Sequence, residues 1–275
     1  MFEKITQITG KNVGPTSIIL AGVHGNERCG IDAFKKIIPT LKIEAGDVFF
    51  IYGNPKAIEV NQRFTEANLN RMFKNDDLLS DVEKNSYEYK RVQFLKTYLN
   101  QAGALLDIHA SFTPNSKPFI ICEANAKGIA EYLPVNMIVS GFDQVEPGGT
   151  DYYMNSIGKI GICLECGYLN DPKSAVIAKK SIISFLEARG HISNNSKISK
   201  QSYIKIYDLC FTKTNNFSLI KPFADFEEIL SGQVIGTDGE EEIKTKKDSM
   251  ILFAQNKNKV GEEAFLLGEK KNSLA

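Results

Sequence analysis

Apolar residues are concentrated in four short runs within the first two thirds of the chain. These runs span residues 16–23, 47–53, 104–108 and 160–165. Each is almost continuously apolar and does not alternate, which is typical of strands buried on both faces of a sheet. Segments with helical character lie between them. Strands that alternate with helices predict an α/β layered domain with a mixed, largely parallel sheet.

Two of the intervening helices are indicated by residues at their ends. Ser80 and Glu83 have the spacing of a capping box, which predicts one helix running toward Gly103. Asp171 and Pro172 provide a cap and a first-turn proline for another helix. Its apolar positions recur near the helical period and a glycine ends it: Val176, Ile183 and Leu186, then Gly190.

The pattern changes beyond a polar stretch at residues 192–202, whose composition is typical of a linker. Short β-prone segments separated by Gly, Asp, Asn and Lys follow it, namely 202–207, 250–253 and 264–267. We therefore predict a catalytic domain over residues 1–195 and a small all-β domain over residues 200–275.

Composition excludes several classes of function. The 33 basic and 33 acidic residues balance, so the chain lacks the charge excess of a nucleic-acid or anionic-membrane binder. The first residues have no long apolar segment with a cleavage site, and no apolar run approaches membrane-spanning length. Five scattered cysteines do not resemble a disulfide framework. We expect a cytoplasmic protein that acts on a small molecule, and a homo-oligomer is compatible with the sequence.

Three candidate polar residues lie where the predicted strands end. His24 and His109 each follow a buried strand, and Glu165 closes another. Ligands of α/β sheets bind at the carboxyl ends of strands, so these side chains are expected to converge. Glu27 adds a carboxylate three residues after His24, and two histidines with one carboxylate suit Zn²⁺ while leaving a position for water. His191, after a helix stop, is expected to be solvated.

Residue chemistry alone leaves an alternative open for these positions. A histidine and an acidic residue three apart recur often by chance, so the motif is weak by itself. His24 and His109 could equally be strand-end residues that satisfy backbone groups. Glu165 could be a surface carboxylate at the end of its strand.

The set of motifs resembles the succinylglutamate desuccinylase/aspartoacylase family, which is similar to the zinc metallocarboxypeptidases. The resemblance rests on five segments in matching order: Gly22–Glu27, Gly53–Ala57, Arg63 with Asn68–Phe73, Asp107–His109, and Leu164–Gly167. It extends over about residues 16–190, and the β-rich tail is similar to the family's C-terminal domain. It implies a three-layer α/β/α zinc-exopeptidase-like domain followed by a small all-β domain.

The resemblance also implies roles for individual residues. One Zn²⁺ per chain would be held by His24, Glu27 and His109, and Glu165 would be the carboxylate that accepts the proton of the attacking water and passes it to the leaving amine. The implied activity is removal of an acyl group from an N-acyl amino acid or a similar carboxylated substrate.

Three further residues complete the implied site. Arg63 would stabilise the oxyanion that forms on the amide, because a guanidinium favours the transition state more than the substrate. Asn70 and Arg71 would bind a substrate carboxylate, for which the planar fork of arginine is suited. A metallo-carboxypeptidase would use the same pair for a peptide C-terminus, and a catalytically inactive binding protein on this fold is a third hypothesis.

Two departures from the usual family pattern affect the interpretation. Glu165 lies between Cys163 and Cys166, and this Cys-x-x-Cys spacing could indicate a redox or second metal site, although no other cysteine pair completes a tetrahedral set. Asn68 replaces the more usual aspartate, which changes the hydrogen bonding expected around Arg71.

Overall fold

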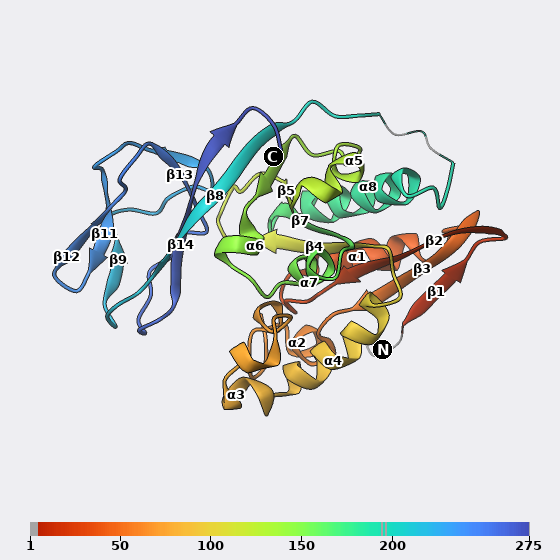
Figure 1. The fold of residues 1–275 in the computed structure, drawn as a ribbon, viewed down its shortest axis with the longest axis horizontal. Helices are drawn as coiled ribbons and strands as arrows, with labels where there is room; N and C mark the ends of the chain where they lie inside the picture. Colours follow the sequence, from red (N-terminus) through yellow and green to blue (C-terminus); the bar gives the residue numbers. More distant parts are fainter. Residues whose placement is uncertain (1–4, 194, 196, 275) are drawn as a thin grey trace.

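The four apolar runs form neighbouring strands at the centre of one large sheet (Figure 1). The computed structural model describes residues 5–193, 195 and 197–274. The central strands pair in parallel, in the order β3, β2, β4, β7. They span Ala45–Tyr52 (β3), Asn12–Ala21 (β2), Ala104–Ser111 (β4) and Ile160–Tyr168 (β7). Every residue of β4 is buried, as a continuous apolar run predicts. The predicted mixed, largely parallel sheet is confirmed.

Within the described residues, seven further strands extend this sheet to eleven. One strand continues it beyond β3, namely β1 (Thr6–Thr9), and the others follow β7 in the spatial order β5 (Phe119–Cys122), β6 (Met137–Ser140), β8 (Ser202–Phe211), β14 (Glu263–Lys271), β13 (Ser249–Leu252) and β10 (Glu227–Ile229). Strand β8 pairs in parallel with β6, so the C-terminal strands continue the central sheet. The C-terminal part is antiparallel from β8 onward.

Helices cover both faces of the sheet, which confirms the three-layer architecture (Figure 1). One face packs against α1 (Arg28–Ile37), α5 (Lys127–Ala130) and α8 (Lys173–Ala188). The other packs against α4 (Tyr87–Leu99) and α7 (Thr150–Ser156). The shorter helices are α2 (Pro55–Val60), η1 (Leu69–Arg71), η2 (Asp76–Leu78), α3 (Asp81–Lys84), η3 (Ala124–Ala126) and α6 (Phe142–Val145). No helix in the described part of the chain has the length and apolar character needed to cross a membrane.

The helix predicted from Ser80 toward Gly103 is two helices in the structure. The capping box of Ser80 and Glu83 is present, but α3 ends after one turn. Ser86 then caps α4 by accepting a hydrogen bond from the backbone N–H of Tyr89. A second serine cap therefore begins a separate helix.

Helix α8 begins one residue later than its proline signal suggests, and Asp171 accepts a hydrogen bond from the Lys173 N–H. The buried positions of α8 include Ile182, Phe185 and Leu186, whereas Val176 is exposed. Val176 therefore does not lie on the buried face that contains Leu186, contrary to the predicted apolar period; single apolar residues are common on protein surfaces.

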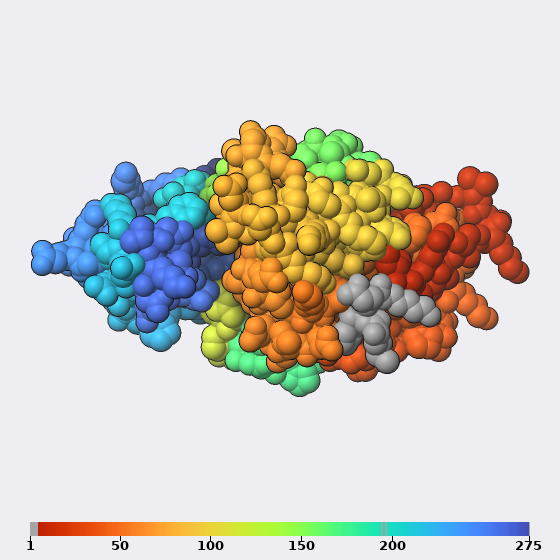
Figure 2. All heavy atoms as spheres, turned by 90° about the horizontal axis from the view of Figure 1, so that it is seen from below, coloured from red at the N-terminus to blue at the C-terminus, as the bar shows by residue number. Residues whose placement is uncertain are grey.

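A second, smaller sheet completes the C-terminal part. It has the strand order β12 (Glu241–Lys244), β11 (Val234–Asp238), β9 (Phe217–Leu219). Figure 2 shows this part at one end of an elongated molecule, beside the region that contains α3 and α4. The all-β character predicted for the C-terminal segment is confirmed.

His191 is not solvated, contrary to the expectation from its position after a helix stop. Its exposed fraction is 0%. Its two ring nitrogens lie within hydrogen-bond distance of the carbonyl of Ala45 and the hydroxyl of Ser17. The turn after α8 brings His191 against β2 and β3, so the ring joins a helix end to the sheet.

Candidate metal centre

The first metal-site segment is a glycine-containing turn between β2 and α1. Gly22 has a φ of 70°, in the left-handed region that favours glycine. A Cβ at Gly25 would lie 2.1 Å from the carbonyl carbon of Ala57, so only glycine allows this close approach. The turn places His24 beside Glu27, whose carboxylate is at the N-terminus of α1. The partial positive charge of the helix end favours the ionised form of that carboxylate.

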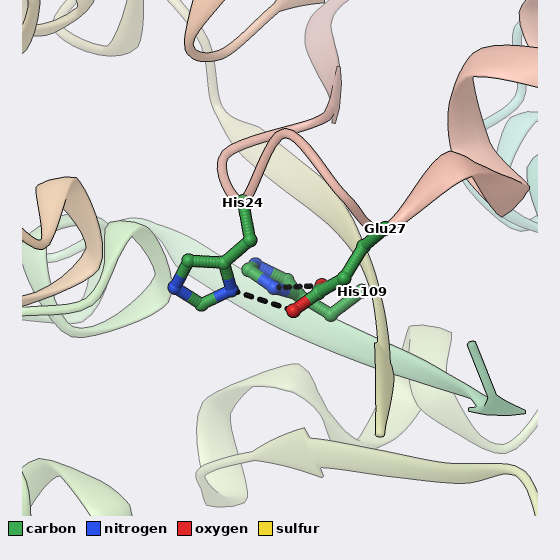
Figure 3. A group of neighbouring side chains, drawn as sticks. All are labelled: His24, Glu27 and His109. Atoms are coloured by element: carbon green, nitrogen blue, oxygen red, sulfur yellow. Dashed lines mark hydrogen bonds and ion pairs between the residues drawn. The ribbon is translucent and has the colours of Figure 1, made fainter. Parts of the chain in front are cut away.

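The two histidines and Glu27 meet at the ends of β2 and β4 (Figure 3). The Nδ1 atom of His24 is 2.8 Å from Oε1 of Glu27, and Nδ1 of His109 is 3.0 Å from Oε2. One potential ligand atom from each residue lies within 4.8 Å of the others. All three side chains are buried. This group could hold a metal ion, and it is the convergence that the strand ends predicted.

Hydrogen-bond acceptors lie beside the other nitrogen of each ring. The Nε2 atom of His24 is 3.1 Å from Oδ1 of Asn68, and Nε2 of His109 is 3.0 Å from Oδ2 of Asp107. Asp107 is fully buried and accepts a hydrogen bond from the Thr150 hydroxyl. Partners of this kind set the orientation and tautomer of histidines that bind metals, with Nδ1 left toward the ion. The donor set therefore fits a metal.

The pKa values of the three residues differ because their surroundings differ. Burial, helped by the nearby Arg63, lowers the pKa of His24 to about 4, so its ring is neutral. Burial also acts to lower the pKa of His109, but the charges of Asp107 and Glu27 raise it well above the usual value. Burial opposes ionisation of Glu27, yet the two histidines hold its pKa well below the ordinary range.

Glu165 lies next to His109 on the adjacent strand. The two residues are register partners in the parallel pairing of β4 with β7. Their side chains therefore point to the same face of the sheet. The Glu165 side chain is buried, and its Oε2 atom has no hydrogen-bond partner among the described residues. Burial, together with the charge of Glu27, raises the pKa of Glu165 to about 8. An unpaired carboxyl group at this position is available to exchange a proton with a bound reactant.

Arg63 lies at the same centre and remains half exposed. Its Nη1 atom donates a hydrogen bond to Oε1 of Glu27 at 3.1 Å, and 41% of its side chain is exposed. The backbone carbonyl of Arg63 also accepts a hydrogen bond from the N–H of Gly25, which ties its loop to the His24 turn. The guanidinium therefore faces the cavity from the ligand side.

Asn70 and Arg71 belong to η1 and also line this cavity. Asn70 accepts a hydrogen bond from the backbone N–H of Thr150. Arg71 binds two carboxylates of the chain itself: Nε and Nη2 donate to Glu263 at 2.7 and 2.9 Å, and Nη2 lies 2.6 Å from Glu146. The sequence did not predict these partners, because Glu263 is 192 residues away along the chain.

Two other neighbours contact the histidines, and one of them, Asp107, could have been predicted from local spacing. Asp107 is two residues before His109 on one strand, and side chains at that spacing share a face. Asn68, the residue that departs from the family pattern, accepts hydrogen bonds from His24 and from the N–H of Asn70. The substitution therefore affects the metal-site histidine and not Arg71 directly.

The Cys-x-x-Cys spacing does not form a second site. Cys163 packs in the apolar cluster between the sheet and the C-terminal strands, whereas Cys166 packs in the cluster under α1 and α8. Residues three apart on a strand point to opposite faces, so the two thiols cannot act together. All five cysteines are free, in agreement with the absence of a disulfide framework.

The candidate centre opens into a cavity of about 510 Å³. Residues from both the central sheet and the C-terminal strands line it. Its apolar lining residues include Ile121, Phe142, Leu209, Phe253 and Leu266, and the C-terminal strands also contribute the carboxyl group of Glu263. This volume is within the range of small-molecule sites.

The sequence matches the Succinylglutamate desuccinylase/Aspartoacylase catalytic domain over residues 13–188. The chain belongs to this family. The family consists of deacylases that hydrolyse amide bonds. The chain's membership of this family confirms the resemblance that the five sequence segments indicate.

Three individual proteins that are similar to this chain extend the comparison. A "probable aspartoacylase" of Trichodesmium erythraeum is 27% identical over 250 residues, which cover 78% of this chain and 82% of that protein. A rat N-acyl-aromatic-L-amino acid amidohydrolase is 30% identical over 166 residues, 54% of this chain and 52% of that protein. The solved structure of a Vibrio cholerae succinylglutamate desuccinylase superposes with a TM-score of 0.81 at 17% identity, covering 97% of this chain and 85% of that one. This last likeness shows the shared fold.

Proposed function

We propose that this chain is a zinc-dependent deacylase that removes an acyl group from an N-acyl amino acid or a similar carboxylated substrate. The observation that carries the proposal is the convergence of His24, Glu27 and His109 near the unpaired carboxyl group of Glu165 in the lining of one cavity. Family membership supports amide hydrolysis, and the similar proteins include a probable aspartoacylase and a succinylglutamate desuccinylase.

Zinc is the metal that fits the three ligands best. Two neutral imidazole nitrogens and a carboxylate are its usual donors in catalytic sites, and three protein ligands leave a position for a reactant. Zinc bound here would polarise the substrate carbonyl and lower the pKa of a water molecule. Asn68 and Asp107 support the assignment because each lies beside the ring nitrogen that faces away from Glu27 and would fix the ring for a metal.

Glu165 is the proposed proton carrier. Its carboxylate takes a proton from the attacking water and returns it to the amide nitrogen as the C–N bond breaks, so the amine leaves neutral and the acyl group leaves as a carboxylic acid. Its buried position beside His109 supports this role, because a raised pKa brings a carboxyl group close to the pKa range useful near neutral pH.

Arg63 and η1 are proposed to act on the substrate. The half-exposed guanidinium of Arg63 stabilises negative charge as it builds on the amide oxygen. Asn70 and Arg71 orient the carboxylate of the amino-acid half. Both line the cavity, which supports the assignment.

Metal analysis tests the first part of this proposal. Wild-type protein is expected to bind one Zn²⁺ per chain, whereas His24→Ala and His109→Ala should lose stoichiometric zinc and, with it, hydrolysis of N-acyl amino acids. His191→Ala is a control for general damage, since this buried histidine lies outside the centre. Full zinc content in both ligand variants would exclude the assignment.

A further inference from the structure

The guanidinium of Arg71 is almost completely occupied by the chain's own acceptors. Glu263 binds its Nε/Nη2 edge with two hydrogen bonds, Glu146 lies 2.6 Å from Nη2, and Nη1 donates to the backbone carbonyl of Asn70. An arginine has five N–H donors, so one on Nη1 remains without a partner in the described part of the chain. Glu263 already forms the bidentate contact expected of a substrate carboxylate.

The charge around Arg71 is already balanced or negative before any substrate binds. Arg71 and Glu146 are largely buried, with side chains 19% and 10% exposed. Burial raises the pKa of Glu146 to about 7 even though Arg71 opposes this change, so Glu146 is only partly ionised near neutral pH. Glu263 alone then balances the charge of Arg71, and a substrate carboxylate brought to Arg71 would add an uncompensated negative charge beside two carboxyl groups. Buried like charges without a compensating cation are strongly unfavourable.

Outside the centre proposed to hold Zn²⁺, the cavity lining supplies little positive charge to this end of the cavity. Its lining includes eight carboxyl groups but three arginine or lysine side chains, so acidic groups dominate: Glu27, Glu83, Asp143, Glu146, Asp151, Glu165, Glu262 and Glu263 against Arg63, Arg71 and Lys257. Arg63 is paired with Glu27 at the metal centre. A substrate that brings its own cation would therefore balance the added carboxylate beside Arg71.

Glu263 is the acceptor best placed to meet such a cation. It begins β14 in the C-terminal part, and 34% of its side chain is exposed, more than that of Glu146. The substrate can bind beside the intact Arg71–Glu263 pair, or its carboxylate can take the place of Glu263. In either arrangement the carboxylate of Glu263 remains in the cavity next to the substrate's amino-acid half.

We propose that Glu263, supported by Glu146, makes this deacylase selective for N-acyl amino acids whose side chain carries a positive charge. The inference rests on the proposed function and narrows its substrate class. Neutral side chains bind less well because they leave the added carboxylate uncompensated, and acidic side chains bind least because they add a further negative charge.

Binding of three length-matched amino acids tests the selectivity without requiring turnover. Calorimetry on wild-type protein with L-lysine, L-norleucine and L-2-aminoadipate, each the amine product of one N-acyl substrate, is expected to give that order of affinity. Lysine should bind at least about tenfold more tightly than aminoadipate. Equal binding, or tighter binding of aminoadipate, would overturn the inference in the wild-type protein alone.

Glu263→Gln identifies the residue responsible. The variant should reduce the lysine-to-aminoadipate ratio about tenfold, chiefly by improving binding of the acidic ligand. Glu241→Gln is the matched control, because Glu241 lies in the same C-terminal part, pairs with Lys213 at the surface and does not line the cavity. An unchanged ratio in folded Glu263→Gln would assign the selectivity elsewhere.

Hydrolysis of the corresponding Nα-acyl derivatives keeps the two proposals separate. If wild-type protein cleaves none of them, the proposed function fails, whereas the binding order still decides the role of Glu263. If it cleaves all three with the acidic derivative preferred in kcat/KM, deacylation stands and the selectivity inference fails.

Discussion

The protonation state of each side chain at the candidate centre follows from its immediate neighbours. His24 is neutral because burial and Arg63 disfavour its charged form, whereas His109 holds a proton because Asp107 and Glu27 flank it. The two histidines are of the same chemical type and lie with ring centroids 5.0 Å apart. In the metal-free protein, one histidine is therefore ready to bind an ion and the other must first lose a proton.

Zinc binding should consequently release a proton from His109. Its raised pKa keeps the ring protonated at neutral pH, and the proton competes with the metal. Affinity for zinc should rise with pH, by up to about tenfold per pH unit, until the pH exceeds the pKa of His109. Calorimetry in buffers of different ionisation enthalpy would count the protons released. Affinity that is independent of pH between about 6 and 8 would contradict this assignment.

Glu165→Gln should keep the fold and bind zinc but lose about 10²–10⁴-fold in kcat. The amide is nearly the same shape as the carboxyl group, yet it cannot accept the proton of water. Zinc content and the unfolding midpoint, measured beside kcat, separate loss of chemistry from loss of structure. Turnover close to that of wild type with metal bound would remove Glu165 from the mechanism.

At the scale of elements, one buried carboxylate holds the loop between α2 and η1. Glu88, in the first turn of α4, is fully buried. It accepts hydrogen bonds from the N–H and hydroxyl of Thr65, from the N–H groups of Glu66 and Ala67, and from the Asn54 amide. Burial acts against its ionisation, but these donors lower its pKa. The carboxylate of Glu88 thus pairs backbone N–H groups that a helix or a sheet would otherwise pair, and this fixes the loop.

The loop held by Glu88 presents Arg63 on one side and Asn68 on the other, so its shape sets the position of both. Glu88→Gln would turn an amide NH₂ toward backbone N–H donors and should cost about 1–3 kcal/mol of stability. We also expect kcat/KM to fall while zinc remains bound, because the His24–Glu27–His109 group is on other segments. The control is Glu66→Gln in the same loop, whose exposed side chain accepts one hydrogen bond from Tyr87. Equal effects in the two variants would exclude a special role for Glu88.

At the scale of the whole molecule, the C-terminal part is joined to the catalytic part both by the sheet and by side chains. Strand β8 continues the central sheet through its parallel pairing with β6. Asp225 of the C-terminal part accepts hydrogen bonds from the hydroxyls of Ser111 and Thr113, at the end of β4, and from the N–H of Phe253. The segment that follows His109 is therefore held by residues more than a hundred positions away.

Asp225→Asn should loosen the end of β4 and lower kcat about tenfold with zinc retained, since partners behind a metal site typically contribute about 10- to 100-fold. Asp238→Asn provides a matched control. Asp238 also lies in the C-terminal part, and its carboxylate accepts three hydrogen bonds, from the N–H of Lys213 and from the N–H and hydroxyl of Thr214. It does not line the cavity. A loss of activity that merely tracks the loss of stability in both variants would contradict a positioning role.

Much of the fold and the metal centre could be predicted because their signals are local. A continuous apolar run must be buried on both faces, and a histidine directly after such a run must lie at the sheet edge. The position of His24, His109 and Glu165 therefore followed from strand ends alone. The division into domains over residues 1–195 and 200–275 stays a prediction, as do the roles of all seven site residues: His24, Glu27, His109, Glu165, Arg63, Asn70 and Arg71.

Only the tertiary structure decided which distant groups meet. It placed His191 in the interior, broke the predicted helix at Ser86 and brought Glu263 onto Arg71 across 192 residues. Such contacts leave no periodic trace, because they depend on how strands order themselves within a sheet and not on the character of neighbouring residues. The sequence by itself determined the layered fold and the polar residues that converge at the strand ends, because both depend on local apolar runs. The charge of the cavity, and with it the selectivity we infer, was decided when β14 packed its carboxylate against the catalytic half.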